Sequence, residues 1–469
     1  MGAYQITGGR PLRGDVPIHG AKNSVLPILA GTLLAGGPCT IHNCPQIADV
    51  ETAVQILRSL GAAVERRGDV LCVDTAQADG TAIPPALMKR MRAAVIFLGP
   101  LLGRFGKADF SMPGGCPLGE RPIDLHLRGL RLMGAQIGGE HDDFHCTAGQ
   151  LKGCTIALPL PSVGATENLM LAALCCRGET VLCNAAREPE IVDLADFLRA
   201  CGGEIHGAGS GVIRITGGRP LHGCEFTVMP DRMEAATYLA AAAATRGDLT
   251  LRGARSGHLT AVLEVLERAG CRITAGTDWI RLRSSGLRAV SPIRTAPYDG
   301  FPTDAQAPVM AAMALAEGNS LFEETIFSDR FCHVGALCAM GAQICAARRV
   351  ALVRGVERLH GAQVCATDLR GGAAITIAAL CAAGESSVLH TEHMERGYAD
   401  FVQILRGCGA EIREYTYGTE QQDQSKTRPA PAELPGGPGG GAPPCGPEGT
   451  RPAGESAGEA KAEGQTAGG

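Results

Sequence analysis

Cys116 lies in a segment whose composition suits a reactive thiol. Residues 111–121, SMPGGCPLGER, are too rich in glycine and proline for a helix or strand, so we expect a surface loop there. Most other cysteines occupy apolar periodic runs that are typical of a packed core, whereas Cys116 is closely followed by Arg121. A basic neighbour favours the thiolate, which is the reactive form of cysteine. Cys116 is therefore a candidate reactive residue, with an inert loop position as the alternative.

Several basic residues at or just before predicted helix starts suit an anionic ligand. They are Lys22, Arg92, Arg121, Arg330, Arg370 and Arg396. Helix N-termini present unpaired N–H groups and a partial positive charge, so several of them facing one cleft would bind phosphate or carboxylate. For each residue alone, a solvated position at a helix end stays open as an interpretation. Asp304 lies in a similar position, where it is either a helix cap after Thr303 or a functional carboxylate.

The elements that position these residues belong to a sixfold internal repeat. Phrases such as LGAAV, MGAQI and CGAEI recur 68 to 73 residues apart, with glycines at positions 61, 134, 202, 270, 341 and 409. Apolar residues at helical spacing precede each glycine, as Val50, Val54 and Leu57 do before Gly61. We therefore expect six helices that end at a C′ glycine. Arg330 is an exception, because its position is apolar in the other repeats.

A second helix, rich in Ala and Leu, precedes each of these six. It ends near a glycine at position 37, 106, 178, 247, 318 or 384. Fourteen residues before these glycines stand Asn23, Arg92, Gly164, Met233, Asp304 and Arg370. With the short β-rich runs between the helices, each unit of about 70 residues indicates a compact βαβαββ subdomain rather than a solenoid repeat. Three units per half predict two pseudo-threefold domains.

Length and composition favour a two-domain α/β protein. At 469 residues the chain exceeds the size of a single core, and its 45% hydrophobic but only 4% aromatic residues indicate a core of Ala, Leu, Val and Ile. The 43 basic and 48 acidic residues are intermixed, which argues against binding to nucleic acid or to an anionic membrane. The longest apolar run, around residues 238–244, is too short to span a bilayer.

The cysteines and the C-terminal residues indicate a cytoplasmic protein with a disordered tail. The 19 cysteines include no C-x-x-C pair, which argues against a zinc ribbon or a disulfide framework and favours a reducing compartment. The segment around Cys116 matches neither G-x-G-x-x-G nor the P-loop pattern, so a nucleotide loop of either kind is disfavoured. Residues 417–469 are almost devoid of large apolar side chains, and we expect them to be disordered.

Several motifs resemble those of the UDP-N-acetylglucosamine 1-carboxyvinyltransferases, a family of enolpyruvyl transferases. The resemblance covers residues 1 to about 416 and includes GAKNSVLPILA around Lys22, PGGCPLGERPIDLH around Cys116 and FPTDAQA around Asp304. Further matches are PSVGAT, ETIFSDRF, GAQVCATDLR and MERGY. The cysteine-containing string separates this family from the shikimate-pathway enolpyruvyl transferases of the same fold.

The resemblance implies an α/β fold of two inside-out α/β barrels. Each domain would contain three βαβαββ repeats related by pseudo-threefold symmetry, as the internal repeats also suggest. Residues 22–229 would form the N-terminal domain, which carries the Cys116 loop, and residues 1–21 plus 230–416 the C-terminal domain.

The resemblance also implies a reaction. The 3′-hydroxyl of UDP-N-acetylglucosamine would attack C2 of phosphoenolpyruvate, and inorganic phosphate would leave, in the first committed step of peptidoglycan precursor synthesis. Cys116 would protonate C3 of phosphoenolpyruvate and can form a covalent adduct with it, while Asp304 would accept the hydroxyl proton. The resemblance implies no metal and no organic cofactor, and the partners would be the two small substrates, with no nucleic acid and no membrane.

The remaining candidate residues would bind these substrates. Lys22, Arg121 and Arg396 match groups that contact the phosphate, and Lys22 and Arg396 also count as catalytic. Arg330 and Arg370 match groups near the carboxylate, with Asn23 beside them. The nucleotide-sugar contacts would be Arg92, Arg121, Pro122, Ile123, Asp124, Leu125, Ser162, Val163, Gly164, Asp304 and Ile326.

Two other functions are alternatives. A shikimate-type transferase would act on a smaller carboxylate acceptor, but it would lack the cysteine string. A silent nucleotide-sugar binding protein would need neither Cys116 nor Asp304, and the sequence has both.

Overall fold

The computed structural model describes residues 1–114, 123–139 and 142–418 of the chain. Three residues of the predicted site, Cys116, Arg121 and Pro122, lie outside the described residues, and so does the predicted tail from residue 419. None of the helices in the described ranges combines the length and the apolar character that a membrane span needs.

One helix of each repeat is buried on nearly all sides. These six are α1 (Lys22–Ala35), α4 (Leu98–Phe105), α6 (Val163–Leu174), α8 (Arg232–Ala244), α10 (Thr303–Met313) and α12 (Leu369–Cys381). In α8 all of residues 233–244 are buried, and in α12 all of residues 369–380. Such all-round apolar helices belong inside a core. Two hydrophobic clusters result, one around α1, α4 and α6 and one around α8, α10 and α12.

A second helix in each repeat ends at the predicted glycine. These helices are α2 (Ala48–Ser59), α5 (Asp124–Leu132), α7 (Pro189–Ala200), α9 (Thr260–Arg268), α11 (Val334–Ala339) and α13 (Phe401–Gly407). All six glycines follow the C-cap residue and have φ between 92° and 103°, so the C′ prediction is confirmed. The buried helices end less regularly. For example, the C-cap residue of α1 is Gly36 (φ 62°), one residue before the predicted Gly37.

The described residues also form three 3-10 helices and one short α-helix. They are η1 (Arg92–Phe97), which leads into α4, and α3 (Pro85–Arg90), η2 (Ser256–His258) and η3 (Thr391–His393). The helix predicted to start at Arg92 therefore begins as a 3-10 helix.

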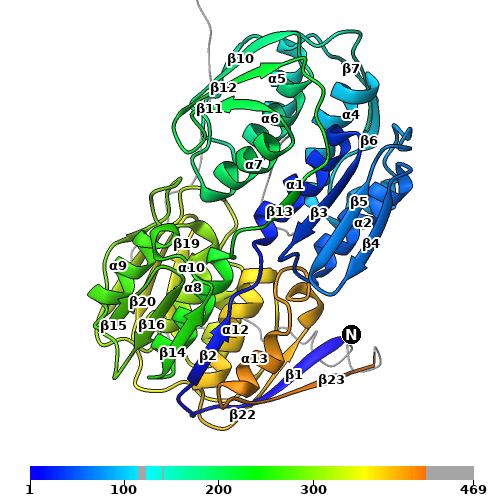
Figure 1. Cartoon of the computed structure of the whole chain (residues 1–469). Coiled ribbons are helices and arrows are strands. Elements are labelled where there is room, and N and C mark those ends of the chain that lie inside the picture. Colours follow the sequence, from blue (N-terminus) through cyan, green and yellow to red (C-terminus); the bar gives the residue numbers. More distant parts are fainter. Residues whose placement is uncertain (115–122, 140–141, 419–469) are drawn as a thin grey trace, which may run out of the picture. The chain divides into compact units, whose positions relative to one another are not determined.

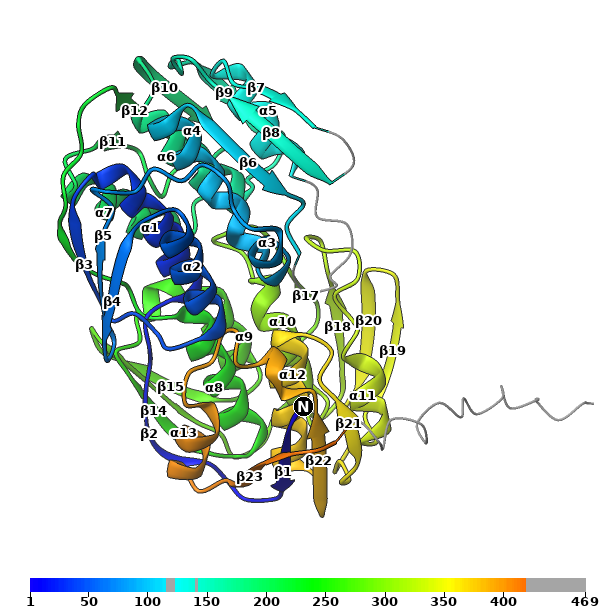
Figure 2. The same cartoon turned by 90° about the vertical axis from the view of Figure 1, so that its right-hand side faces the viewer.

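Each repeat carries a sheet. In five of the six, one parallel pair is extended by antiparallel strands, whereas the pairs of the three-stranded sheet are all antiparallel. In the first half the sheets are β13 (Glu225–Thr227), β3 (Pro38–His42), β5 (Val70–Asp74), β4 (Ala63–Arg67); β6 (Lys107–Ser111), β8 (Asp143–Thr147), β7 (Gln136–Gly138); and β9 (Thr155–Ala157), β10 (Gly178–Cys183), β12 (Val212–Gly217), β11 (Glu204–His206). In the second half they are β2 (Arg13–Pro17), β14 (Asp248–Arg252), β16 (Trp279–Arg283), β15 (Arg272–Ala275); β17 (Ile293–Arg294), β18 (Asn319–Glu323), β20 (Val350–Arg354), β19 (Gln343–Ala347); and β21 (Gln363–Cys365), β22 (Glu385–Leu389), β1 (Gly2–Thr7), β23 (Glu411–Thr416). The sheets lie outside the buried helices, as Figures 1 and 2 show.

The N-terminal strands join sheets from the second half of the chain. β1 lies between β22 and β23, antiparallel to both, and β2 pairs in parallel with β14. β13, which follows the last helix of the first half, pairs in parallel with β3. These pairings and the two hydrophobic clusters are consistent with the proposed domains, residues 22–229 and residues 1–21 plus 230–416.

Candidate functional site

Asp304 lies between two buried arginines. It is the second residue of α10, and its carboxylate accepts hydrogen bonds from Nη2 of Arg330 at 2.9 Å and from Nε and Nη2 of Arg370, both at 3.3 Å. The side chains of Arg330 and Arg370 are 2% and 3% exposed, whereas that of Asp304 is 28% exposed. The carboxylate is therefore the accessible part of an otherwise buried ion cluster.

The charges around Asp304 keep it ionised. Burial alone would raise the pKa of its carboxyl group. The positive charges of Arg370, Arg330 and Lys22 outweigh that effect and hold the pKa well below its usual range. Asp304 is thus an anion at neutral pH, and it is a weak base while both arginines contact it.

Both arginines have hydrogen-bonding capacity beyond Asp304. Nε of Arg330 and Nη1 of Arg370 are buried and have no partner among the described residues. Buried polar groups normally have partners, and an arginine binds carboxylate or phosphate oxygens with several donors at once. A small anion with several oxygens therefore suits this position.

Asp49 pairs with the two other predicted cations. Its carboxylate lies 3.0 Å from Nζ of Lys22, and it accepts hydrogen bonds from Nε of Arg396 at 2.9 Å and Nη2 at 3.3 Å. Asp49 is buried in the first turn of α2. Asp49 was not among the residues predicted from the sequence, although it lies 12 residues before the C′ glycine of its repeat and Arg396 lies 13 before its own.

Two more aspartates, also missed, fix helix starts at the site. Asp231 caps α8 and accepts the backbone N–H of Lys22 at 3.0 Å. Asp368 caps α12 just before Arg370, and its carboxylate lies 4.0 Å from Arg330. Aspartate directly before a helix is the signal that could have identified both residues.

Glu324 holds the segment of Ile326 against the start of α10. Its buried carboxylate accepts the backbone N–H groups of Ile326 at 2.8 Å and Phe327 at 3.1 Å, and the hydroxyl of Thr303 at 2.9 Å. Thr303 directly precedes Asp304 in the chain. The predicted nucleotide-sugar contact Ile326, which is half-exposed, is therefore linked to the position of Asp304.

A second group of predicted residues surrounds His126. Arg92 donates a hydrogen bond to the carbonyl O of Pro113 at 3.2 Å, and Ser162 caps α6. Burial and the charge of Arg92 lower the pKa of His126 to about 4. Gly164 faces the same imidazole so closely that a Cβ there would lie 3.3 Å from its Cε1. His126 is buried and hydrogen-bonded, since Nδ2 of Asn168 lies 3.0 Å from its Nδ1.

The remaining predicted residues lie beside these groups. Ile123 is buried immediately before α5, Asp124 is exposed in its first turn, and Leu125 is half-buried one residue before His126. Val163 follows Ser162 at the start of α6. Asn23, half-buried, follows Lys22 in α1.

The structure thus gathers the described candidates into two groups. The first group holds two ion clusters, Asp304 with Arg330 and Arg370 and Asp49 with Lys22 and Arg396, which the charge of Lys22 near Asp304 connects. In the second group, Arg92, residues 123–125 and residues 162–164 gather around His126. The loop that carries Cys116 and Arg121 is outside the described residues.

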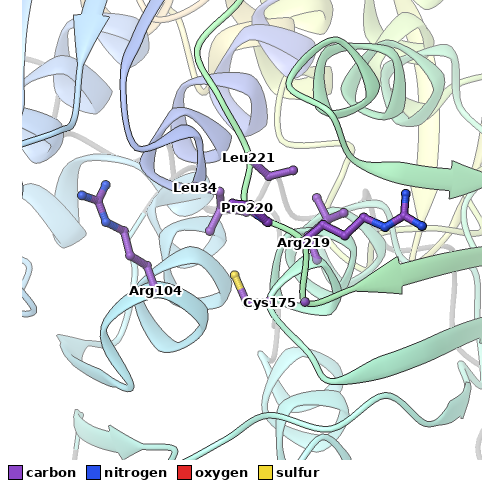
Figure 3. A pocket seen from close by; sticks show the side chains of 8 residues that line it. Leu34, Arg104, Cys175, Arg219, Pro220 and Leu221 are labelled. Atoms are coloured by element: carbon purple, nitrogen blue, oxygen red, sulfur yellow. The ribbon is translucent and has the colours of Figure 1, made fainter.

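A cavity of about 370 Å³ lies elsewhere in the first half and involves none of the predicted residues. Its lining consists of Leu34, Arg104, Leu174, Cys175, Gly218, Arg219, Pro220 and Leu221 (Figure 3). Its two arginines already have partners, because Arg104 donates to the carbonyl O of Leu33 at 2.7 Å and Arg219 lies 2.8 Å from Glu204. The ion cluster around Asp304 therefore remains the candidate site.

Comparison with known proteins places the chain among enolpyruvyl transferases. The pattern of the EPSP synthase (3-phosphoshikimate 1-carboxyvinyltransferase) family matches residues 6–405. UDP-N-acetylglucosamine 1-carboxyvinyltransferase 2 of Caldanaerobacter subterraneus subsp. tengcongensis is 46% identical over 413 residues, which are 88% of this chain and 99% of the relative. The UDP-N-acetylglucosamine 1-carboxyvinyltransferase of Shewanella amazonensis is 47% identical over 415 residues, with the same coverage of both chains.

Solved structures agree on the fold. The enolpyruvyl transferase NikO from Streptomyces tendae superposes with a TM-score of 0.82 at 27% identity, covering 89% of this chain and 99% of that one. EPSP synthase from Acinetobacter baumannii gives a TM-score of 0.71 at 22% identity, covering 89% and 100%, which shows the fold alone. The predicted α/β fold of inside-out barrels is confirmed.

The neutral, buried state of His126 predicts a pH-dependent stability. Its pKa in the folded chain lies below its ordinary value, so on acidification the unfolded chain takes up the proton first and stability falls below about pH 6.5. The variant His126→Asn keeps an acceptor near the position of Nδ1 for Asn168 but has no imidazole to protonate. Between pH 8 and pH 5 its free energy of unfolding should therefore fall by about 2 kcal/mol less than that of the parent. Urea unfolding at both pH values measures this difference, and equal losses in the variant and the parent would contradict it.

Proposed function

The chain belongs to the enolpyruvyl transferases and, within them, to the UDP-N-acetylglucosamine 1-carboxyvinyltransferase family, and we propose that it transfers the enolpyruvyl group of phosphoenolpyruvate to the 3′-hydroxyl of UDP-N-acetylglucosamine. The observation that carries this proposal is the 46–47% identity to enzymes of that name over 99% of their length. Inorganic phosphate is the second product, and the step begins peptidoglycan precursor synthesis.

This role places the protein in the cytoplasm and links it to cell shape and division. All 17 cysteines of the described ranges are free thiols, as a reducing compartment would keep them.

In the addition step, the hydroxyl oxygen forms a bond to C2 of phosphoenolpyruvate while C3 gains a proton. In the elimination step, C3 loses a proton and the C2–O bond to phosphate breaks, which leaves an enolpyruvyl ether. Cys116 is the proposed proton donor to C3 and also the residue that forms a covalent adduct with phosphoenolpyruvate. Its loop is glycine-rich, and its position lies outside the described residues.

Asp304 is the proposed base for the hydroxyl proton, and its ion pairs suggest how it becomes one. With Arg330 and Arg370 directed at Asp304, the carboxylate is too weakly basic for efficient proton transfer. The carboxylate of phosphoenolpyruvate offers both guanidinium groups a competing anion. A shift of their hydrogen bonds to the substrate would raise the pKa of Asp304 and prepare it to accept a proton only when substrate is present.

The phosphate group would compete for the second set of cations in the same way. Lys22 and Arg396 contact Asp49 in the described structure, and Arg121 would join them from the loop. Asn23 lies next to Lys22 and would add an amide donor. Electrostatic stabilisation of the departing phosphate by these groups is typical of closed, charged sites.

The residues around His126 are the proposed nucleotide-sugar site. Arg92 and Arg121 would bind the diphosphate, and residues 122–125 and 162–164 would contribute backbone groups at the starts of α5 and α6. Ile326, held by Glu324 near Asp304, would bind the same substrate from the other half. Asp304 would then meet the 3′-hydroxyl of the bound sugar.

The acceptor is tested by following phosphate release from phosphoenolpyruvate. UDP-N-acetylglucosamine should support turnover, whereas shikimate 3-phosphate, the acceptor of the alternative enzyme, should not. Release with shikimate 3-phosphate would replace the proposal with the shikimate-type reaction, and binding of the nucleotide sugar without release would indicate a silent binding protein.

Cys116→Ala should lower kcat at least about 100-fold, because it removes the proposed proton donor. Cys116→Asp should keep measurable turnover, since a carboxylic acid also donates a proton. Loss of inactivation by a thiol-directed epoxide in both variants would show that Cys116 is the modified residue. Unchanged turnover in Cys116→Ala would exclude the role.

Asp304→Asn should also lower kcat at least about 100-fold, because an amide still accepts hydrogen bonds from arginine but takes no proton. Asp49→Asn is the matched control, since Asp49 contacts Lys22 and Arg396 but has no proposed proton transfer. It should change the KM for phosphoenolpyruvate more than kcat. A kcat within about threefold of the parent in Asp304→Asn would remove it as the base.

A further inference from the structure

Three cysteines from distant parts of the chain meet in the first half of the protein. Cys39 lies in β3, Cys201 directly follows α7 and Cys224 directly precedes β13. Their sulfur atoms all lie within 4.8 Å of one another, and Sγ of Cys201 is 3.4 Å from Sγ of Cys224. In the described part of the chain, no other group of three histidine, cysteine or acidic side chains has this geometry.

We propose that Cys39, Cys201 and Cys224 bind a thiophilic metal ion of the zinc class. Thiolates are the soft ligands that such ions prefer. Sulfur ligands about 2.3 Å from a tetrahedral zinc ion lie about 3.8 Å apart. The sulfur atoms of Cys201 and Cys224 are 3.4 Å apart, and no pair of the three is more than 4.8 Å apart. Each sulfur–sulfur distance therefore needs to change by no more than about 1 Å to reach the value for zinc.

The backbone holds two of the ligands in place. β3 and β13 pair in parallel, and the N–H of Thr40 donates to the carbonyl O of Cys224 at 2.9 Å. Gly223 approaches Pro38 so closely that a Cβ would lie 1.8 Å from its carbonyl O. The segments of Cys39 and Cys224 are therefore fixed side by side, which reduces the entropy lost when a metal binds.

The burial of the three thiols suits a bound ion. Cys39 and Cys201 are fully buried, whereas Cys224 is only partly buried and leaves one side of the cluster open to solvent. A metal ion can enter there, and water can provide its fourth ligand.

This site is separate from the proposed reaction. Lys22 begins α1, and Cys39 follows the end of that helix, whose 14 residues span about 21 Å. A metal ion there would connect α7, β3 and β13 without touching the ion cluster around Asp304. Its expected effect is on stability, because a ligand that binds only the folded chain stabilises it.

The test measures zinc and cadmium binding to the full chain under anaerobic conditions with a phosphine reductant. Titration against a chromogenic chelator should show one zinc ion per chain, and cadmium should give an ultraviolet sulfur-to-metal charge-transfer band. Cys39→Ala, Cys201→Ala and Cys224→Ala should each weaken zinc binding at least about tenfold and reduce the band. Zinc should also raise the thermal midpoint of the parent chain, and not that of the variants.

Cys72→Ala is the matched control. Cys72 lies opposite Thr40 in the neighbouring strand β5 but outside the cluster, so its variant should bind zinc as the parent does. Phosphate release by each variant, without zinc, shows that it is folded. Equal zinc affinity in the parent and the three cluster variants would overturn the proposal, and so would the absence of zinc binding to the parent chain under the same conditions.

Discussion

The pairing of buried guanidinium groups with Asp304 is the interaction on which the candidate site depends. Arg330 and Arg370 are almost fully buried, and a buried charge without a partner costs about 3–5 kcal/mol. Their shared carboxylate is at the start of α10, whereas the arginines precede α11 and begin α12. Asp304 and Arg330 belong to the fifth repeat and Arg370 to the sixth, so the folded chain must bring these two repeats together before Arg370 is paired.

The same principle explains the second ion cluster. Lys22 comes from the first repeat and Arg396 from the last, and Asp49 neutralises both where they meet. Four of the proposed anion-binding cations thus have a carboxylate partner in the described structure: Lys22, Arg330, Arg370 and Arg396. Such pairs keep the cations positioned and partly desolvated, so an incoming anion exchanges partners rather than ordering free side chains.

The repeat architecture brings these groups together. Five residues share one position as the second residue of a buried helix, fourteen residues before the glycine that follows it: Asn23, Gly164, Met233, Asp304 and Arg370. Because all-round apolar helices must lie inside, their ends, and not their sides, are free for polar groups. Carboxylates such as Asp231 and Asp368 cap these ends and fix the backbone on which the arginines stand.

The sequence by itself determined the repeats, the six C′ glycines, the helix starts and the family, because these depend on local spacing and on continuous motifs. It also predicted one site that contains Asp304, Arg330, Arg370, Lys22 and Arg396. Only the tertiary structure decided which of these groups contact each other. Asp49 and Arg396 are 347 residues apart, and the cysteines at 39, 201 and 224 share no motif such as C-x-x-C. Contacts of this kind arise where different repeats pack together, and no local periodicity predicts them.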